Sequence, residues 1–270
     1  MAAQAQEAHS NWRQALADVG VVGAYSELGF GRVDENSTIP FADSTRFLQW
    51  RVGAIASYLD SKLVVTPSVT LKTQSGSGAN QFAPRIDTRS AIAGASLAMA
   101  YAPTTMLRFQ LGGSVSRGEQ TVTFNATDTS DTDLFSSSVF AGVGVDVYRD
   151  LRTRVTISDQ LAYHYGFADY APNNSIDDSA SRIVSNTLSV KGQYRITATT
   201  SVDASVGLVS LLKSETFAAE DELDTTYGII SIGASHQFTD GPTLYGTLGT
   251  TIGNDNSSDL TGKLGLRFMF

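Results

Sequence analysis

Apolar and polar residues alternate along most of the chain after residue 20, and this period of two dominates the pattern. In residues 63–71 the odd positions carry Leu, Val or Pro, whereas the even positions are mostly Thr and Ser. Residues 155–167 repeat the pattern, with one interruption at Asp159 on the apolar side. Such alternation predicts β-strands longer than the usual ~5–6 residues. A tilted strand of about ten residues is long enough to cross a lipid bilayer.

Short turns and longer polar segments separate the alternating segments in regular succession. The short turns lie at residues 60–62, 102–105, 149–152, 197–199 and 239–242, and the aromatic residues just before them are Tyr58, Tyr101, Tyr148, Tyr194 and Phe238. The longer polar segments span residues 34–45, 74–88, 118–136, 168–181, 214–224 and 254–258. Together they predict twelve strands, at 20–33, 46–58, 63–73, 89–101, 105–117, 137–148, 152–167, 182–195, 200–213, 225–238, 243–253 and 259–270.

This arrangement predicts an all-β fold, a transmembrane antiparallel up-and-down β-barrel of about 12 strands over residues 19–270. Short turns on one side and long loops on the other are typical of outer-membrane barrels, and the aromatic residues before the turns suit an interfacial girdle. Soluble all-β folds fit less well. Lipocalin-like barrels are smaller, propeller blades use four short strands, and β-helices have shorter repeats.

Residues 1–18 do not alternate, and we predict a short N-terminal helix there. Trp12 and Leu16 lie at helical spacing, behind polar residues that can cap the helix. A helix this short needs a surface to pack against. We therefore predict that it enters the barrel lumen as a plug, with Trp12 and Leu16 packing on the wall and Arg13 meeting a lumenal carboxylate.

The last eleven residues are the most specific single element of the sequence. One face of residues 260–270 is apolar or glycine and ends on Phe268 and Phe270, while Lys263 and Arg267 occupy the other face. A basic side chain facing lipid costs ~2–4 kcal/mol at the midplane, so both cations must face the lumen. This ending resembles the terminal strand of bacterial outer-membrane barrels. The resemblance implies recognition of Phe268 and Phe270 by the barrel assembly machinery, and a bacterial outer-membrane location with both termini in the periplasm.

The same phase argument turns a mainly basic set of residues toward the lumen. The set comprises Arg51, Arg108, Arg154, Lys191, Arg195, Lys263 and Arg267, with Asp203 as an acidic member. Asp146 also belongs inside, and a β-bulge near the end of its strand is then needed to keep Tyr148 outside. Two interpretations stay open. The cations line a water-filled, anion-preferring channel, or they pair with lumenal carboxylates or the plug and hold the barrel in shape.

Composition narrows the range of partners. The net charge is −8, with 19 Lys and Arg against 27 Asp and Glu, which disfavours nucleic-acid binding. The chain has no cysteine, so disulfide scaffolds and thiolate metal sites are excluded. The acidic run at residues 128–133 lacks the glycine and glutamate of an EF-hand calcium loop. We therefore expect no metal and no cofactor, and outer-membrane lipid and lipopolysaccharide as surroundings.

Among the functional classes, an enzyme has the least support in the sequence. Twelve-stranded outer-membrane phospholipases carry an outward Ser–His–Asn set, with His and Ser two residues apart on one strand. Two residues from His164 and from His236 this chain has only Ala, Gly or Phe, so the pattern fails at both. We expect no catalytic residues.

A barrel preceded by a helix resembles two families of secretion pores. One is the barrel of the functional-amyloid (Fap) secretion channel, which the sequence favours, and the other is the autotransporter translocator domain. Both imply a channel for polypeptide cargo, of the amyloid-subunit kind in the first family. The alternatives are an anion-preferring solute porin, and a structural or adhesive barrel that acts through its acidic loops. Outward alanines at residues 91, 93 and 95 leave a homo-oligomer such as a trimer open.

Overall fold

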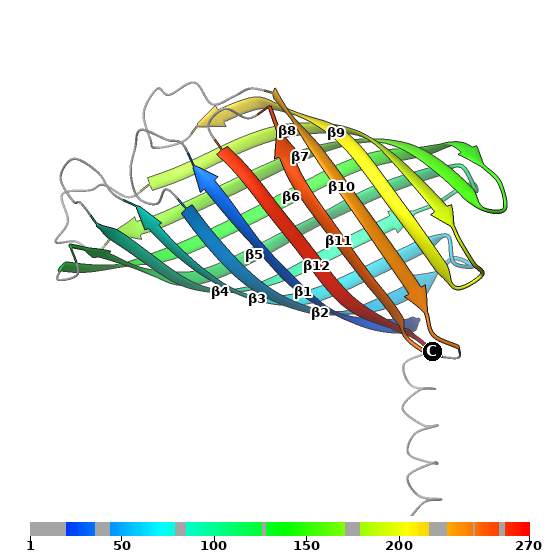
Figure 1. Cartoon of the computed structure of the whole chain (residues 1–270), viewed down its shortest axis with the longest axis horizontal. Coiled ribbons are helices and arrows are strands. Elements are labelled where there is room, and N and C mark those ends of the chain that lie inside the picture. The colour runs from blue at the N-terminus through cyan, green and yellow to red at the C-terminus, as the bar shows by residue number, and fades with distance from the viewer. Residues whose placement is uncertain are drawn as a thin grey trace, which may run out of the picture.

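The computed structural model describes residues 20–35, 44–78, 85–125, 128–170, 179–215, 226–239, 241–253 and 257–270. These residues form twelve strands (Figure 1). They are β1 (Val21–Glu35), β2 (Ser44–Tyr58), β3 (Leu63–Gly78), β4 (Ile86–Tyr101), β5 (Leu107–Phe124), β6 (Asp128–Arg149), β7 (Thr153–Tyr170), β8 (Ser179–Arg195), β9 (Thr200–Glu215), β10 (Thr226–Gln237), β11 (Thr243–Ile252) and β12 (Ser257–Met269).

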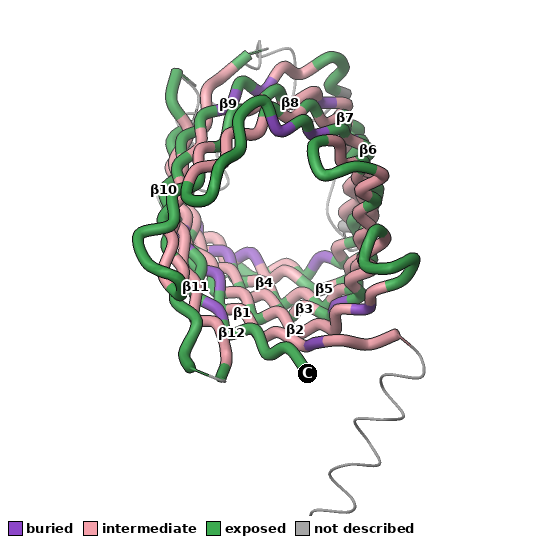
Figure 2. Tube along the Cα trace, turned by 90° about the vertical axis from the view of Figure 1, so that its right-hand side faces the viewer, coloured by how far each residue is buried: buried purple, intermediate pink, exposed green. Residues whose placement is uncertain are grey.

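Every strand pairs antiparallel with its neighbours in sequence, and β1 pairs with β12, which closes the sheet into a barrel (Figure 2). The β1–β12 seam runs from the Gly23–Met269 pair to the Glu35–Ser257 pair. Closure gives each of the twelve strands a hydrogen-bonded neighbour on both sides, which is the condition for a sheet to stand in lipid. The prediction of a closed antiparallel barrel with twelve strands is confirmed.

The outer wall of the barrel carries large apolar side chains on all twelve strands, interrupted on β7 by Asp159. Leu28, Trp50, Leu71, Leu111, Leu188, Ile232 and Leu264 are among the large side chains exposed there. Such a continuous apolar surface is far larger than the patches that soluble monomers expose, and it requires an apolar surrounding. Among the described residues, no helix is long and apolar enough to pass through a membrane.

The β5–β6 hairpin corrects one prediction. Residues 118–136, expected as a long loop, continue the two strands up to a tight turn at Asn125, whose φ is 50°. The extension has its own inner contacts, because Ile86 and Val122 are fully or nearly buried and Phe124 packs against them. Outward pairs join the same strands, with Thr121 donating a hydrogen bond to Asp131. The Thr and Ser residues of this segment are polar, which led to the prediction of a loop, but Thr also fits well into a β-strand.

The β-bulge expected near the end of β6 is present. The β6–β7 register shifts between Asp146 and Tyr148, so that Val147 has no partner of its own. Asp146 is buried, whereas Val147 and Tyr148 are both exposed on the outer wall. The extra residue lets the Asp146 carboxylate face the lumen while Tyr148, only two positions later, faces outward.

The N-terminal helix and its plug residues Trp12, Arg13 and Leu16 lie outside the described residues. They stay predictions, as does the domain boundary at residue 18.

Candidate functional site

The lumen opens at the short-turn end into a basic pocket of about 350 Å³, which we call the basic mouth. Its lining includes five arginines and one carboxylate: Arg149, Asp150, Arg152, Arg154, Arg195 and Arg267. Polar side chains fill the intervals between them: Gln193, Ser201, Ser235, Gln237 and Thr243. The mouth therefore carries an excess of positive charge, which favours anions.

Strand register explains why these residues meet. Arg154 on β7 lies opposite Gln193 on β8, and Arg195 lies opposite Ser201 on β9. At the other edge of the mouth, Arg267 on β12 lies opposite Thr243 on β11. All of these positions share the inward phase of their strands, because alternate side chains point to opposite faces of a sheet.

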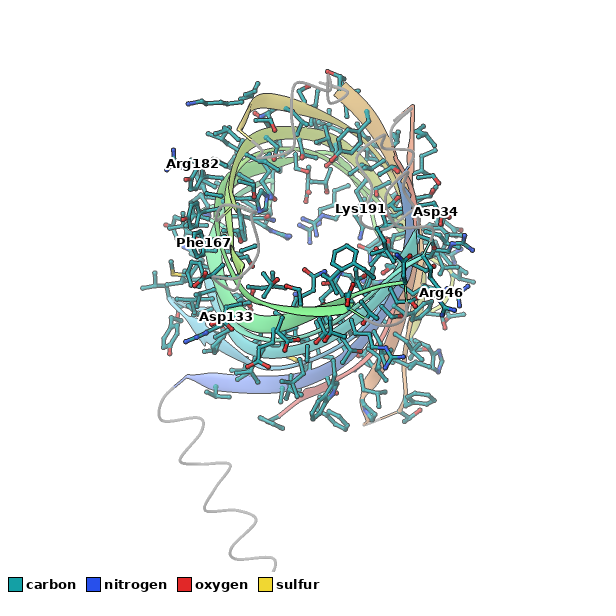
Figure 3. The ribbon with its side chains drawn as sticks, turned by 90° about the vertical axis from the view of Figure 1, so that its left-hand side faces the viewer. Asp34, Arg46, Asp133, Phe167, Arg182 and Lys191 are labelled. Carbon is teal, nitrogen blue, oxygen red and sulfur yellow. The ribbon has the colours of Figure 1, made fainter. Side chains whose placement is uncertain are left out.

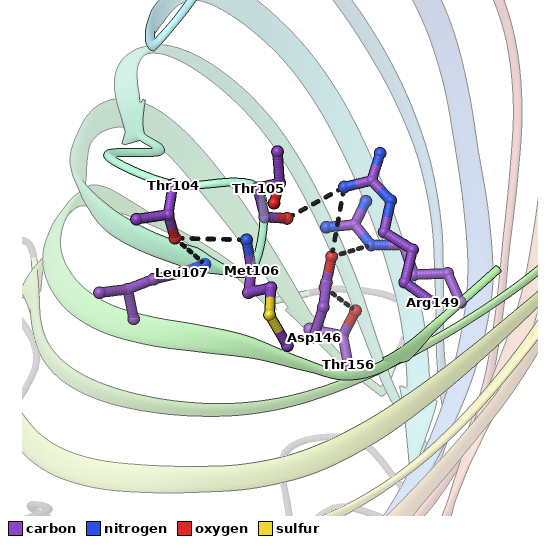
Figure 4. A network of polar contacts seen from close by, with 8 residues as sticks. Thr104, Thr105, Met106, Leu107, Asp146, Arg149 and Thr156 are labelled. Carbon is purple, nitrogen blue, oxygen red and sulfur yellow. Dashed lines mark hydrogen bonds and ion pairs between the residues drawn. The ribbon is translucent and has the colours of Figure 1, made fainter.

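Asp146 organises the wall beside the mouth (Figure 4). Its carboxylate accepts hydrogen bonds of 2.8 Å from Arg154 Nε and from Thr156 Oγ1. Arg149 Nη1 lies 3.9 Å from the same carboxylate and donates to the Thr105 carbonyl oxygen at 2.9 Å. The network ties the β6–β7 hairpin to the neighbouring short turn, so it fixes two of the mouth's arginines in place.

Asp150 closes the β6–β7 turn itself. The backbone N–H groups of Thr153 and Arg152 both donate to its carboxylate, and these bonds hold the pKa of Asp150 below its usual value. The Tyr148 hydroxyl adds a third bond at 2.8 Å. The turn that displays Arg152 is therefore fixed by a charged group.

Lys191 projects into the lumen from β8 (Figure 3). Its Nζ lies 2.8 Å from the Asp203 carboxylate, and β9 carries that partner on its inward phase. The lysine is half exposed while the aspartate is largely covered. Asp203 thus offsets part of the lysine charge, while the cation stays the member of the pair that faces the pore.

A second carboxylate, Glu27, lies in the lumen at the β1–β12 seam. Arg51 Nη1 and Lys263 Nζ approach its Oε1 to 4.0 and 3.9 Å. The Tyr245 hydroxyl donates to Oε2 at 3.3 Å from β11, across the intervening strand β12. Gly265 makes this reach possible, because a Cβ there would overlap the Tyr245 ring.

The predicted lumenal residues differ in how close a carboxylate lies to them. Arg51, Arg154, Lys191 and Lys263 each lie within 4.0 Å of a carboxylate, and Asp203 is one of these partners. Arg108 lies within electrostatic reach of Asp146 and Arg154. Arg195 and Arg267 line the basic mouth, and within the described part of the chain neither has an ion-pair partner. The paired cations thus fit the interpretation that ion pairs hold the barrel in shape, and Arg195 and Arg267 fit the interpretation of an anion-preferring channel.

Some residues of the site were missing from the sequence-based prediction. Arg149 and Arg152 also line the mouth. Arg149 follows the bulge and Arg152 lies in the turn, so the alternation of a regular strand does not predict their direction. Tyr245 joins Glu27 only because closure brings residues 218 apart into contact. Phe268 and Phe270, the predicted assembly signal, are exposed on the outer wall. No cluster of three or more metal-binding side chains occurs among the described residues.

His236 lies on the outer wall near the short turns. Its Nδ1 is 2.9 Å from the Thr200 hydroxyl, and its ring packs edge-on against Phe238 at 5.0 Å. These contacts suit a side chain at an interface between apolar and polar surroundings.

No family model matches the chain, and no curated protein matches it either. Among solved structures, the translocator domain of the autotransporter NalP from Neisseria meningitidis is similar over 99% of this chain and 98% of its own, with a TM-score of 0.76 at 13% identity. The transport unit of the autotransporter AIDA-I from Escherichia coli covers 92% and 90%, with a TM-score of 0.70 at 10% identity. An outer-membrane channel from Pseudomonas putida F1 covers 93% and 96%, with a TM-score of 0.55 at 13% identity.

At these identities the likeness concerns the fold. The resemblance to autotransporter translocator domains drawn from the sequence is confirmed at that level, while the resemblance to the functional-amyloid secretion channel stays a hypothesis. The chain therefore has the barrel fold of outer-membrane translocators and channels.

Proposed function

We propose that the chain forms a bacterial outer-membrane pore that conducts polypeptide, with residues 1–18 acting as its plug. The fold it shares with autotransporter translocator domains supports a translocation role. The continuous apolar outer wall supports a place in a bilayer. In this proposal both termini lie on the periplasmic side, the assembly machinery reads Phe268 and Phe270, and the cargo is of the amyloid-subunit kind suggested by the sequence resemblance.

The observation that carries the proposal is the chemistry of the lumenal wall. Serine hydroxyls on neighbouring strands bond to each other across the inner face, at 2.6–2.9 Å: Ser68–Ser96, Ser114–Ser138, Ser116–Ser136, Ser158–Ser189, Ser201–Ser235 and Ser205–Ser231. Each pair uses one donor and one acceptor, so the wall still offers a passing chain neutral hydroxyl groups, which carry no charge that would select particular side chains. Four of the predicted lumenal cations lie within 4.0 Å of a carboxylate, and such a wall suits an extended polypeptide.

The plug is tested by single-channel recording in planar bilayers. We expect the full chain to conduct poorly, and a variant that lacks residues 1–18 to conduct steadily. Trp12→Ala should raise the open probability, because it removes the packing that we assign to the helix. Equal conductance with and without residues 1–18 would show that the helix does not block the pore.

The polypeptide path is tested separately, on the variant without residues 1–18. An unfolded, cysteine-free peptide added to one chamber should produce current blockades whose duration grows with peptide length. Blockades that do not depend on length would contradict passage and indicate binding at the mouth alone.

A solute pore with anion preference is the second candidate, and the basic mouth favours it. Arg195 and Arg267 have no carboxylate partner among the described residues, so their charge acts on mobile ions. We expect Arg195→Ala and Arg267→Ala to shift the reversal potential in a salt gradient toward cations. Arg117→Ala is the control, because Arg117 is on the outer wall and bonds to Asp133 at 3.1 Å. An unchanged reversal potential in the two mouth variants would eliminate this candidate.

A further inference from the structure

We propose that the outer wall of the barrel binds a phosphate-bearing lipid in a groove over β2–β5, near the long-loop end. The groove has a volume of about 570 Å³, and Arg46 and Arg89 lie on its two sides. Small side chains form its floor between them: Thr73, Ser75 and Ala91. We call it the arginine groove. It lies on the opposite face of the sheet from the lumen, so the proposal goes beyond the pore function.

Register places the two arginines on either side of one β3 residue, Ser75. Arg46 on β2 pairs with Ser75 on β3, and Ser75 pairs with Arg89 on β4. Two strand spacings of about 4.8 Å therefore separate their backbones, a distance that two long guanidinium side chains can bridge around one phosphate. Arg32 on β1 extends the same row, because it lies opposite Arg46.

The two groove arginines differ from the other basic residues at this end of the wall. Arg32 bonds to Asp34 at 2.7 Å, Arg85 to Asp87 at 2.8 Å and Arg117 to Asp133 at 3.1 Å. Within the described ranges, neither Arg46 nor Arg89 has an ion-pair partner, although both are exposed. Glu119 lines the far edge of the groove without pairing with Arg89. Two exposed guanidinium groups at the rim of a lipid-facing wall favour an anionic headgroup, although Asp34 also lies within electrostatic reach of Arg46.

An apolar track runs from the groove toward the middle of the wall. On β4, Ala91, Ala93 and Ala95 follow one another on the outer face. Larger side chains flank this column. On β3, Leu71 lies opposite Ala93, and on β5, Val115 lies opposite Ala95 while Arg117, paired with Asp133, lies opposite Ala93. A column of methyl groups between larger neighbours is a shallow slot that suits an acyl chain. The headgroup site and the slot are continuous, which is why we assign the groove to a lipid.

The experiment uses the full chain in nanodiscs of phosphatidylcholine that contain a minor fraction of diphosphorylated lipid A. Native mass spectrometry counts the lipid A molecules retained per barrel, and a titration gives their dissociation constant. We expect Arg46→Ala and Arg89→Ala to weaken lipid A binding about tenfold each, which corresponds to ~1.4 kcal/mol per arginine. Glu119→Gln should strengthen binding, because it removes the negative charge at the edge.

Arg182→Ala is the matched control. Arg182 is also exposed near the long-loop end, and it lies on the other side of the barrel from Arg46 (Figure 3). We expect this variant to bind lipid A as the unaltered chain does. Equal weakening by Arg182→Ala would reduce the effect to overall charge and overturn the proposal. So would unchanged binding in the Arg46→Ala, Arg89→Ala double variant, or full displacement of lipid A by equimolar inorganic phosphate. Folding of each variant is checked by its heat-modifiable migration on gels.

Discussion

Two lumenal carboxylates on opposite sides of the barrel are built in different ways. Asp146, between β6 and β7, receives two bonds of 2.8 Å from residues eight and ten positions along the chain. Glu27, at the β1–β12 seam, has three partners at 3.3–4.0 Å, and the Tyr245 hydroxyl comes from 218 residues away. The first network is short-range and tight, whereas the second is long-range and loose.

The difference indicates what each network does. Asp146 and its partners belong to one hairpin, so they fix a turn and the arginines beside it at little cost in chain entropy. Glu27 joins β1, β2, β11 and β12, so it can form only when the two ends of the sheet have met. Its looser contacts leave Lys263 half exposed and able to exchange partners with ions in the pore. We infer that Asp146 serves local structure, and that the charge of Glu27 serves permeation.

The largest effect should come from breaking the seam. In Gly265→Val the new side chain would displace the Tyr245 ring from its place over β12. We expect a loss of about 3 kcal/mol in the free energy of unfolding, because an overpacked site must shift its neighbours. Urea unfolding followed by tryptophan fluorescence measures it. Gly192→Val is the control, since a Cβ at Gly192 meets nothing within 4 Å. Equal losses in both variants would contradict a special role for the seam.

Removal of the Asp146 charge should have the next largest effect. Asp146→Asn leaves Arg154 and Arg149 without their carboxylate, and we expect unfolding to become easier by about 2 kcal/mol. Asp159→Asn is the matched control on β7. Asp159 lies on the outer wall, where its carboxylate accepts a 2.7 Å bond from Asn186. Neutralising a charge that faces lipid should not destabilise the barrel. A larger loss in Asp159→Asn than in Asp146→Asn would reverse our ranking.

Glu27→Gln should separate permeation from stability. We expect a change below about 1 kcal/mol in the free energy of unfolding, because the contacts of Glu27 are long and partly exposed. The reversal potential in a salt gradient should nevertheless shift toward anions, since Arg51 and Lys263 lose their shared counter-charge. The same shift in Asp146→Asn would show that the two carboxylates do not differ in this respect.

The smallest effect concerns pH and the β6–β7 turn. Hydrogen bonds from the backbone lower the pKa of Asp150 below 3.8 in the folded barrel, so its stabilising contribution is present above that value. The contribution disappears as the pH falls through the lowered pKa. Asp150→Asn should therefore be less stable than the unaltered chain at neutral pH, and the difference should vanish in strong acid. A difference that persists in acid would mean that the charge of Asp150 is not the cause.

The sequence predicted the strands well, because each crosses an apolar medium and must keep a period of two. It also predicted the bulge, since Asp146 and Tyr148 could not both satisfy a regular strand. The extent of the β5–β6 hairpin was wrong, because above the membrane both faces of a strand are wet and alternation carries no signal. The Glu27–Tyr245 contact could not be predicted, since it depends on the register of four strands around the closure.

The basic mouth has a further consequence, which concerns the direction of current. Carboxylates lie within 4.0 Å of Arg154, Lys191 and Lys263 on the lumenal wall, while Arg195 and Arg267 at the short-turn end have no such partner among the described residues. A pore with fixed charge at one entrance concentrates anions there alone, so equal voltages of opposite sign drive unequal currents. We therefore expect the open barrel to behave as a weak rectifier. The polarity that carries more current would report which way an inserted barrel faces.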